Sequence, residues 1–239
     1  MKRFKWLLLS VPFILLFSAC SSKPIELPEI DELQLIVQDD FAEGPVNAIP
    51  TNWTQVARPN AEGAPYVSDE RARAGEYALR IGREQDAPNI TNGAALSFDS
   101  LRLRALVSFW FYASDTKRSL TFALIGSDSG QFLFGASAGP FLILNNGKVQ
   151  GYSQAEDRFI DAGTYKPEQW HQVTLDIDIR ERTYNVFVDD AIEPNNEEPI
   201  PFRNNDIRDI SQFGVAYHAV GSSPGHLPVY IDDVEVRGK

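Results

Sequence analysis

The chain is dominated by the two-residue alternation of apolar and polar positions that β-strands produce. From about Leu33 onward, short apolar runs are separated by Gly, Pro, Asn and Asp, and almost no window keeps the i, i+3, i+4 spacing of an amphipathic helix. One short helical turn is predicted at 68–73, where Ser68 would be the cap. The Asn-Asn-Gly sequence at 145–147 tolerates positive φ and predicts a tight hairpin. The alternation predicts strands over 107–112, 119–125, 131–135, 140–144, 148–152, 171–179, 183–188, 213–218 and 229–236.

Two of these stretches indicate which residues are buried. In the first, Phe109 and Phe111 fall on one face and Trp110 and Tyr112 on the other, because successive strand residues point to opposite sides. Both faces of this strand carry large apolar side chains, so both should be at least partly covered. In 171–179, apolar residues alternate strictly with polar ones, which is typical of a strand with one buried face.

About a dozen short strands and no long helix predict an all-β protein, either a sandwich or a barrel. Six short motifs stand out, at Asp39-Asp40-Phe41, Trp53, Val107–Phe111, Trp170–Asp178, Tyr184–Asp189 and Tyr230–Val236. Together they resemble the concanavalin A-like (laminin G-like) jelly roll over most of residues 36–237. The resemblance implies a two-sheet antiparallel jelly-roll sandwich of the lectin and glucanase type.

The chain departs from this family at Asp189-Asp190, where the family usually turns on Asp-Gly. A tight turn without Gly is strained. The segment Ala191–Pro201, rich in Glu, Asn and Pro, is therefore expected to form a longer loop.

The N-terminus has the pattern of an export signal. Three cations in the first five residues precede an apolar run over 6–17, which is too short for a permanent membrane-spanning helix. The run leads into Ser-Ala-Cys at 18–20, which resembles a bacterial lipoprotein signal. The resemblance implies acylation of Cys20, palmitate included, and an outer-membrane location, because Ser21 rather than Asp follows. The alternative is an ordinary signal peptide with Cys20 incidental.

We therefore expect three parts: a signal peptide at 1–19, a flexible acidic tether at 20–34, and one jelly-roll domain at 35–239. A chain of 239 residues fits a single domain for an all-β protein. The acidic stretch Glu29–Glu32 superficially resembles the carboxylate cluster of jelly-roll β-glucanases, in which alternate acidic residues on one strand face the sugar. It precedes the first strand, so we interpret it as solvated linker.

The composition excludes several classes of function. The chain has 33 acidic residues against 22 Lys and Arg, a formal net charge of −11, and loss of the leader's cations makes the remainder about −14. A field of this sign disfavours nucleic acid as a partner. It also favours neutral or cationic glycans over polyuronates unless Ca²⁺ or a local Arg cluster intervenes. A single Cys excludes disulfides and Cys-based metal sites within the chain.

Histidine-led catalysis has few candidates, because His171, His218 and His226 are the only imidazoles. Tyr217-His218 is the most suggestive pair, since polysaccharide lyases on this fold use Tyr with His or Arg. Adjacent strand residues point to opposite faces, however, so this pair would need a bulge to share a cleft. No nucleophile elbow, P-loop or HExxH motif is present, and we predict no catalytic residues.

Ligand binding is predicted at Trp110, Tyr112 and His218. Indole and phenol rings stack on the apolar face of a sugar, and Trp110 with Tyr112 lies opposite the predicted core face of its strand. Trp53 and Trp170 are also able to stack on a sugar, and the alternative is that all three tryptophans belong to the core. For Trp170 the core is favoured, because the resemblance to the laminin G-like fold implies burial where the preceding loop enters its strand.

A structural calcium site is a further prediction. Asp39, Asp40, Asp232 and Asp233 lie near the two ends of the domain, and jelly rolls commonly pair their first and last strands. Four carboxylates brought together in this way would suit Ca²⁺. The alternative is that these residues are solvated charges that protect strand edges.

The leading functional hypothesis is a lipid-anchored envelope protein whose domain binds carbohydrate or another extracellular polymer non-covalently. A polysaccharide lyase or glycoside hydrolase on the same fold is the alternative, and a structural module that docks onto a partner protein is the third. A groove in which Arg, Tyr and His converge would favour the enzyme. An aromatic platform without them would favour binding, and a face filled with bulky side chains would favour the structural module.

Overall fold

The computed structural model describes residues 29–57, 65–82, 91–116, 119–127, 137–154, 156–218 and 228–239. In these ranges no helix is long and apolar enough to cross a membrane. One short 3₁₀ helix, η1 (Ile30–Glu32), precedes the strands. The strands are β1 (Gln34–Asp39), β2 (Trp53–Ala57), β3 (Tyr66–Ser68), β4 (Ala78–Ile81), β5 (Thr91–Leu101), β6 (Arg104–Ala113), β7 (Ser119–Ile125), β8 (Ala138–Asn145), β9 (Lys148–Ser153), β10 (Arg158–Thr164), β11 (Trp170–Asp178), β12 (Thr183–Val188), β13 (Ile200–Pro201), β14 (Ile210–His218) and β15 (Val229–Gly238).

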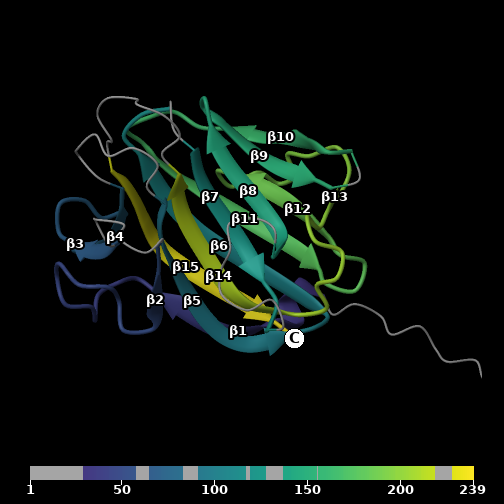
Figure 1. The fold of residues 1–239 in the computed structure, drawn as a ribbon, viewed down its shortest axis with the longest axis horizontal. Helices are drawn as coiled ribbons and strands as arrows, with labels where there is room; N and C mark the ends of the chain where they lie inside the picture. Colours follow the sequence, from purple (N-terminus) through teal and green to yellow (C-terminus); the bar gives the residue numbers. More distant parts are fainter. Residues whose placement is uncertain are drawn as a thin grey trace, which may run out of the picture.

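The strands form two antiparallel sheets that are stacked as a sandwich (Figure 1). The eight-stranded sheet has the order β13-β12-β11-β6-β15-β4-β3, with β1 also paired to β15. The seven-stranded sheet has the order β10-β9-β8-β7-β14-β5-β2. Because β1 pairs with β15, the first and last strands of the domain lie side by side. The predicted all-β, two-sheet antiparallel jelly-roll sandwich is confirmed.

Most strands with clear alternation were predicted closely. Strands β7 and β12 have the predicted bounds, and β6, β8, β9, β11, β14 and β15 differ from prediction by a few residues at their ends. The strand predicted at 131–135 lies outside the described residues. Strands β1 to β5, β10 and β13 lie where the sequence singled out no strand, because those segments are short or lack regular alternation.

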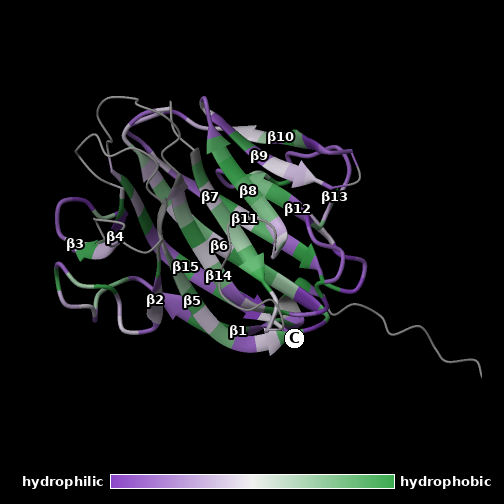
Figure 2. Cartoon of the chain, in the orientation of Figure 1, coloured by the Kyte–Doolittle hydropathy of each residue, from purple (hydrophilic) through white to green (hydrophobic). Residues whose placement is uncertain are grey.

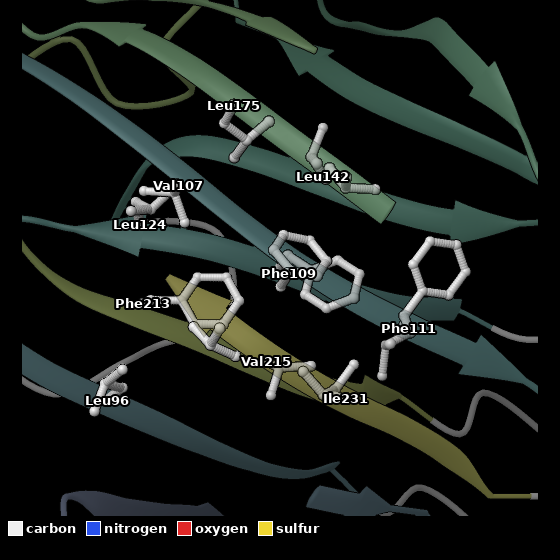
Figure 3. Packing of buried hydrophobic residues seen from close by; sticks show 14 of the residues in the cluster. Leu96, Val107, Phe109, Phe111, Leu124, Leu142, Leu175, Phe213, Val215 and Ile231 are labelled. Atoms are coloured by element: carbon white, nitrogen blue, oxygen red, sulfur yellow. The ribbon is translucent and has the colours of Figure 1, made fainter. Parts of the chain in front are cut away.

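The inner faces of the two sheets form one apolar core (Figure 3). Phe109 and Phe111 of β6 are fully buried, as predicted, and point toward side chains of the opposite sheet. The Phe109 ring centroid lies 4.3 Å from that of Phe122 and 5.2 Å from that of Phe213. Burying each such side chain stabilises the fold by about 1.5–3 kcal/mol. Strand β11 alternates between buried and half-buried residues over its whole length, and Figure 2 shows the matching change of hydropathy along the ribbons.

Two turns follow from local sequence. Asn146 and Gly147, with φ of 50° and 75°, close the predicted hairpin between β8 and β9. Asp189 and Asp190 both have positive φ, 54° and 55°, a conformation that Asp tolerates better than most residues. Residues 189–199 then form the predicted longer loop before β13.

The helical turn predicted at 68–73 is wrong. Asp69–Tyr77, between β3 and β4, has no helical hydrogen bonding. Ser68 ends β3, and its Oγ accepts the N–H of Glu70 at 3.2 Å, so the side chain caps a bend rather than a helix. This loop lies on the outer face of the eight-stranded sheet, where it determines which aromatic side chains are accessible.

Candidate functional site

Trp110 and Tyr112 lie on the outer face of the eight-stranded sheet, within a row of four aromatic residues. Strand β6 pairs with β11 on one side and β15 on the other, so Tyr112 stands between Trp170 and Tyr230. The Tyr112 ring centroid is 5.7 Å from Trp170 and 6.1 Å from Tyr230, and Tyr112 is only 6% exposed. We call Trp110, Tyr112, Trp170 and Tyr230 the covered row.

The Asp69–Tyr77 loop places two arginines on this row. The Arg71 Cζ lies 4.1 Å from the Tyr112 ring centroid, and the Arg73 Cζ lies 4.1 Å from the Trp110 ring centroid. A guanidinium at this distance occupies the ring face on which a sugar would stack. The prediction that Trp110 and Tyr112 form a free binding platform is therefore wrong, because an intramolecular cation takes the position of the ligand.

Asp232 and Asp233 hold this loop in place. The buried Asp232 carboxylate accepts the Arg73 N–H at 2.7 Å and the Asp233 N–H at 2.8 Å. Asp233 pairs with the Arg73 guanidinium at 3.3 Å. Burial raises the pKa of Asp232 to about 6, despite the backbone N–H groups that donate to it. Both residues are thus anchors of the loop.

The other two predicted calcium ligands have separate partners. Asp39 accepts the Trp53 indole N–H at 2.7 Å and the Phe41 N–H at 2.8 Å. Asp40 accepts the Ala42 N–H at 3.1 Å. The indole hydrogen bond orients Trp53, which is buried in the core. Trp170 is half-buried beside Tyr112 on the outer face, so its predicted place in the core is wrong.

The prediction that the four carboxylates gather in one site is wrong for the chain as described. The two chain ends do pair, with Asp39 opposite Val234. Among the described residues, however, no group of three or more His, Cys, Asp or Glu side chains could hold a metal ion. Asp39 and Asp40 instead border an open cleft of about 620 Å³ lined by Gln38, Asp39, Asp40, Ala42, Glu43, Gly44, Pro50, Thr51 and Asn52.

His171 and Asp189 form a His–Asp pair that is part of the fold. The distance from His171 Nδ1 to Asp189 Oδ2 is 2.7 Å, and the Lys166 N–H donates to Nε2 at 3.0 Å. The imidazole is 6% exposed and packs against Phe111, with ring centroids 5.6 Å apart. Both ring nitrogens of the buried imidazole have partners, while the Asp189 side chain is 46% exposed, so the pair joins the start of β11 to the loop after β12.

The Tyr217-His218 pair does not share a cleft through a bulge. Tyr217 is 3% exposed and belongs to the core. The pairing of β14 with β7 is regular from Gln212 to His218, so the strand has no bulge at this pair. The side chain of His218 lies outside the described part of the chain, so its predicted role in ligand binding stays a prediction. His226 lies outside the described residues, as does Cys20.

An apolar groove of about 410 Å³ lies on the same outer face, toward the other end of β6. Its carboxylates already have partners, because Asp176 binds Arg104 through two hydrogen bonds and Asp189 binds His171. Ile192 on its rim is 94% exposed. The groove therefore offers few free hydrogen-bonding groups to a sugar; its lining residues are Ile30, Leu106, Gln172, Thr174, Asp176, Phe187, Asp189, Asp190, Ala191 and Ile192.

A second group of aromatic side chains lies on the outer face of the seven-stranded sheet. Tyr152 of β9 pairs directly with Phe159 of β10, and their rings are 5.3 Å apart in a T-shaped arrangement. Gly151 points inward, since a Cβ on it would meet Ile200 at 2.5 Å, and Tyr152 therefore points outward. Phe159 is 42% exposed, so its ring is open to solvent.

Arg203, which follows β13, completes this group. Its Cζ lies 4.4 Å from the Phe141 ring centroid and 4.7 Å from the Tyr152 ring centroid. Phe141 is largely buried, whereas Arg203 and Tyr152 are half-buried. We call Phe141, Tyr152, Phe159 and Arg203 the aromatic patch.

Hydrogen-bonding side chains border the patch in the next row of the sheet. Gln150 donates to Asp161 at 2.7 Å, and the Lys148 ammonium also binds this carboxylate. These two donors hold the pKa of Asp161 below its usual range. The Tyr152 hydroxyl donates to Asp157, which raises the pKa of the phenol. The patch thus combines exposed ring surface with amide, ammonium and carboxylate groups at its edge.

Sequence reasoning missed the patch. The alternation of Lys148, Gln150 and Tyr152 against Val149 and Gly151 was a usable signal for an outward row. No strand was predicted at 158–164, so Phe159 had no assigned position. The contact of Arg203 with Phe141 and Tyr152 depends on the path of the chain after β13. A local sequence pattern does not predict that path.

The centre of the seven-stranded sheet lacks acidic residues. Strands β9, β8, β7 and β14 are consecutive in the sheet, and none of them contains an Asp or Glu. A glycosidase needs two carboxyl groups flanking the scissile bond. These four strands offer neither of them.

Comparison with known proteins gives a fold and no family. No protein-family model matches the chain, and a search of curated protein sequences finds no significant match. A sialidase structure matches with a TM-score of 0.63 at 16% identity, covering 86% of this chain but 18% of the sialidase chain.

Two other structures match over nearly their whole length. Lectin II from Ulex europaeus has a TM-score of 0.52 at 10% identity, covering 84% of this chain and 99% of the lectin. SCLam, an endo-β-1,3(4)-glucanase of family GH16, has a TM-score of 0.53 at 13% identity, covering 91% of this chain and 94% of the glucanase. Such low identities establish the fold alone. The chain therefore has the concanavalin A-like jelly-roll fold, which lectins and glycoside hydrolases share.

Proposed function

We propose that this domain binds carbohydrate non-covalently through the aromatic patch. The observation that carries the proposal is the open Phe159 ring, paired with Tyr152 and bordered by Gln150 and Asp161. A pyranose has an apolar face that packs on an aromatic ring and hydroxyl groups at its edge that need donors and acceptors. The patch supplies both on one rigid sheet.

Binding is favoured over catalysis by the placement of the ionisable groups. The central strands of this sheet carry no carboxylate, and the His171 imidazole is buried with both ring nitrogens hydrogen-bonded within the protein. Arg80, Glu70 and Tyr230 do lie within reach of one another, with the Tyr230 hydroxyl donating to Glu70 at 2.6 Å. Arg80 and Tyr230 are buried, however, so this cluster supports the sheet instead of facing a substrate.

The expected affinity is modest. Each aromatic contact contributes about 0.5–1.5 kcal/mol beyond area burial, and the patch has one open ring with a half-buried neighbour. Dissociation constants in roughly the micromolar to millimolar range are therefore expected for single sites.

A glycan array followed by isothermal titration calorimetry on the mature protein tests this proposal. Phe159→Ala should weaken binding of any glycan hit by about tenfold, because it removes the open ring. Trp110→Ala is the matched control, since its ring lies under Arg73 on the other sheet, and it should bind as wild type.

Three results would contradict the proposal. The first is that no glycan binds. The second is that Trp110→Ala loses binding while Phe159→Ala keeps it. The third is release of unsaturated sugars or new reducing ends from a polysaccharide at catalytic protein levels, which would favour the lyase or glycosidase alternative.

We also propose that the domain is held at the bacterial cell envelope by acylation of Cys20, on the sequence pattern of residues 1–20. Mass spectrometry of the mature wild-type protein should find an acylated N-terminal Cys. Cys20→Ala should abolish the acylation and leave the precursor uncleaved or release the protein from membranes. An unmodified N-terminus in the wild type would contradict this.

A further inference from the structure

We propose that the aromatic patch selects glycans that carry a carboxylate, such as uronic acids, and that Arg203 is the residue that recognises it. This inference rests on the proposed function and specifies its ligand class. It departs from the expectation drawn from net charge, because it depends on one local cation and not on the field of the whole chain.

The first step is the position of the guanidinium. The Arg203 Cζ lies over two rings, 4.4 Å from the Phe141 centroid and 4.7 Å from the Tyr152 centroid. Stacking uses the flat faces of a guanidinium and leaves its five N–H donors in the plane free. A carboxylate approaching along that plane accepts two parallel hydrogen bonds.

The second step is the rigidity of the arginine's backbone. The Arg203 N–H donates to the Gly139 carbonyl, and the Asn204 N–H donates to the Ala138 carbonyl, both at 2.9 Å. The neighbouring Phe202 is fully buried and its ring packs closely against Gly139. A Cβ added at Gly139 would lie only 3.0 Å from that ring. The arginine is therefore presented from a fixed edge of β8, so little ordering entropy is lost when a ligand binds.

The third step is the charge that remains unpaired. Within the described part of the chain, Arg203 has no carboxylate partner, whereas Arg104 pairs with Asp176 and Arg158 pairs with Glu156. The positive charge of Arg203 is therefore not neutralised by an ion pair within those residues.

The acidic groups near the patch have partners of their own. Asp157 accepts the Tyr152 hydroxyl, and Asp161 is bound by Lys148 and Gln150. Their negative charge still opposes an anion, but screening limits exposed charges to about 10 Å at 0.1 M salt. A direct bidentate contact with Arg203 is shorter than that range and is charge-assisted.

The geometry fits a uronic acid in particular. Tyr152 lies next to both groups, because its ring centroid is 5.3 Å from that of Phe159 and 4.7 Å from the Arg203 Cζ. The carboxylate lies at the edge of the pyranose ring, so a sugar stacked on the Phe159–Tyr152 pair would direct its carboxylate along the sheet to Arg203. A neutral sugar would make the stacking contact alone.

The test uses matched ligands. Oligomers of galacturonate and of glucuronate are titrated into the mature protein by calorimetry, each before and after reduction of the carboxylates to hydroxymethyl groups. We expect at least one acidic oligomer to bind about tenfold more tightly than its reduced form, as a charge-assisted bidentate contact allows.

Variants assign the preference to one residue. Arg203→Gln should lower affinity for the acidic oligomer about tenfold and leave the reduced form unchanged. Arg203→Lys should restore only part of the preference, because an ammonium cannot bind bidentately. Arg208→Gln removes the same charge from an exposed arginine whose partners are backbone carbonyls, and should change neither affinity.

Equal binding of acidic and reduced oligomers, or an equal loss with Arg208→Gln, would overturn the inference. In either case, if the oligomers still bind and Phe159→Ala weakens that binding, the proposal that the patch binds carbohydrate stands. Absence of binding to every oligomer would overturn this inference, and absence of binding to the glycan array as well would overturn the proposed function.

Discussion

The covered row on the eight-stranded sheet and the aromatic patch on the seven-stranded sheet use the same residue types and differ in accessibility. Both combine aromatic rings with stacked arginines. On the eight-stranded sheet, the Asp69–Tyr77 loop crosses the face, and Asp232 fixes it to β15. On the seven-stranded sheet, β10 is an edge strand, and Phe159 on it stays open to solvent.

The difference shows that aromatic residues on the outer face of a sheet do not by themselves make a binding site. The loop over the covered row places Arg71 and Arg73 against the aromatic rings. Burial of these rings therefore contributes to the stability of the fold. The patch keeps ring surface uncovered, at a cost in exposed apolar area, and such exposure is usually functional when polar groups surround it.

The largest expected effect is on the covered row. Tyr112→Ala removes a 6%-exposed ring packed between Trp170 and Tyr230, and should lower the free energy of unfolding by about 3–5 kcal/mol. Urea denaturation measures this. A loss below about 1 kcal/mol would mean that the row is open and that its contrast with the patch is false.

The second effect is on the pH dependence of the loop anchor. The pKa of Asp232 is raised to about 6 from 3.8, so its contribution to stability is present below about pH 4 and is lost as pH rises through 6. A shift of about two pKa units corresponds to roughly 3 kcal/mol. Asp232→Asn has no such titration, so its stability relative to wild type should rise by about that amount between pH 4 and pH 7. Urea denaturation at both pH values tests this, and a difference that stays constant with pH would contradict it.

A smaller change would partly uncover the row. Arg73→Ala removes the guanidinium over Trp110 and its ion pair with Asp233, and should cost about 0.5–1 kcal/mol. Acrylamide should then quench more of the tryptophan fluorescence. The same substitution in a Trp110→Phe background is the control and should show no added quenching. If quenching does not change in the Trp110 protein, another group covers the indole.

The smallest expected effect on stability is in the patch. Phe159→Ala should change the free energy of unfolding by only about 0.5 kcal/mol, because the ring is 42% exposed at a sheet edge. Phe159→Ala should also bind glycans more weakly. The folded fraction of Tyr112→Ala should bind glycans as wild type does. A stability loss for Phe159→Ala comparable to that of Tyr112→Ala would assign the patch to the core.

The sequence by itself determined the fold class and much of the core. Alternation placed Phe109 and Phe111 inside and their neighbours outside, because the two-residue period of a strand is a local geometric property. Asn146 and Gly147 closed a hairpin, and Asp189 and Asp190 opened a longer loop, for reasons contained in the turn residues themselves.

Only the tertiary structure decided which outward residues are free. Arg73 is 37 residues from Trp110 and 159 residues from Asp232 in the sequence, yet all three meet. Arg203 reaches Tyr152 only because the chain returns along β8 after β13. Contacts between residues so distant in sequence depend on how strands are ordered and how loops cross them. Local periodicity fixes the face of a side chain, but what covers that face is set by the path of the whole chain.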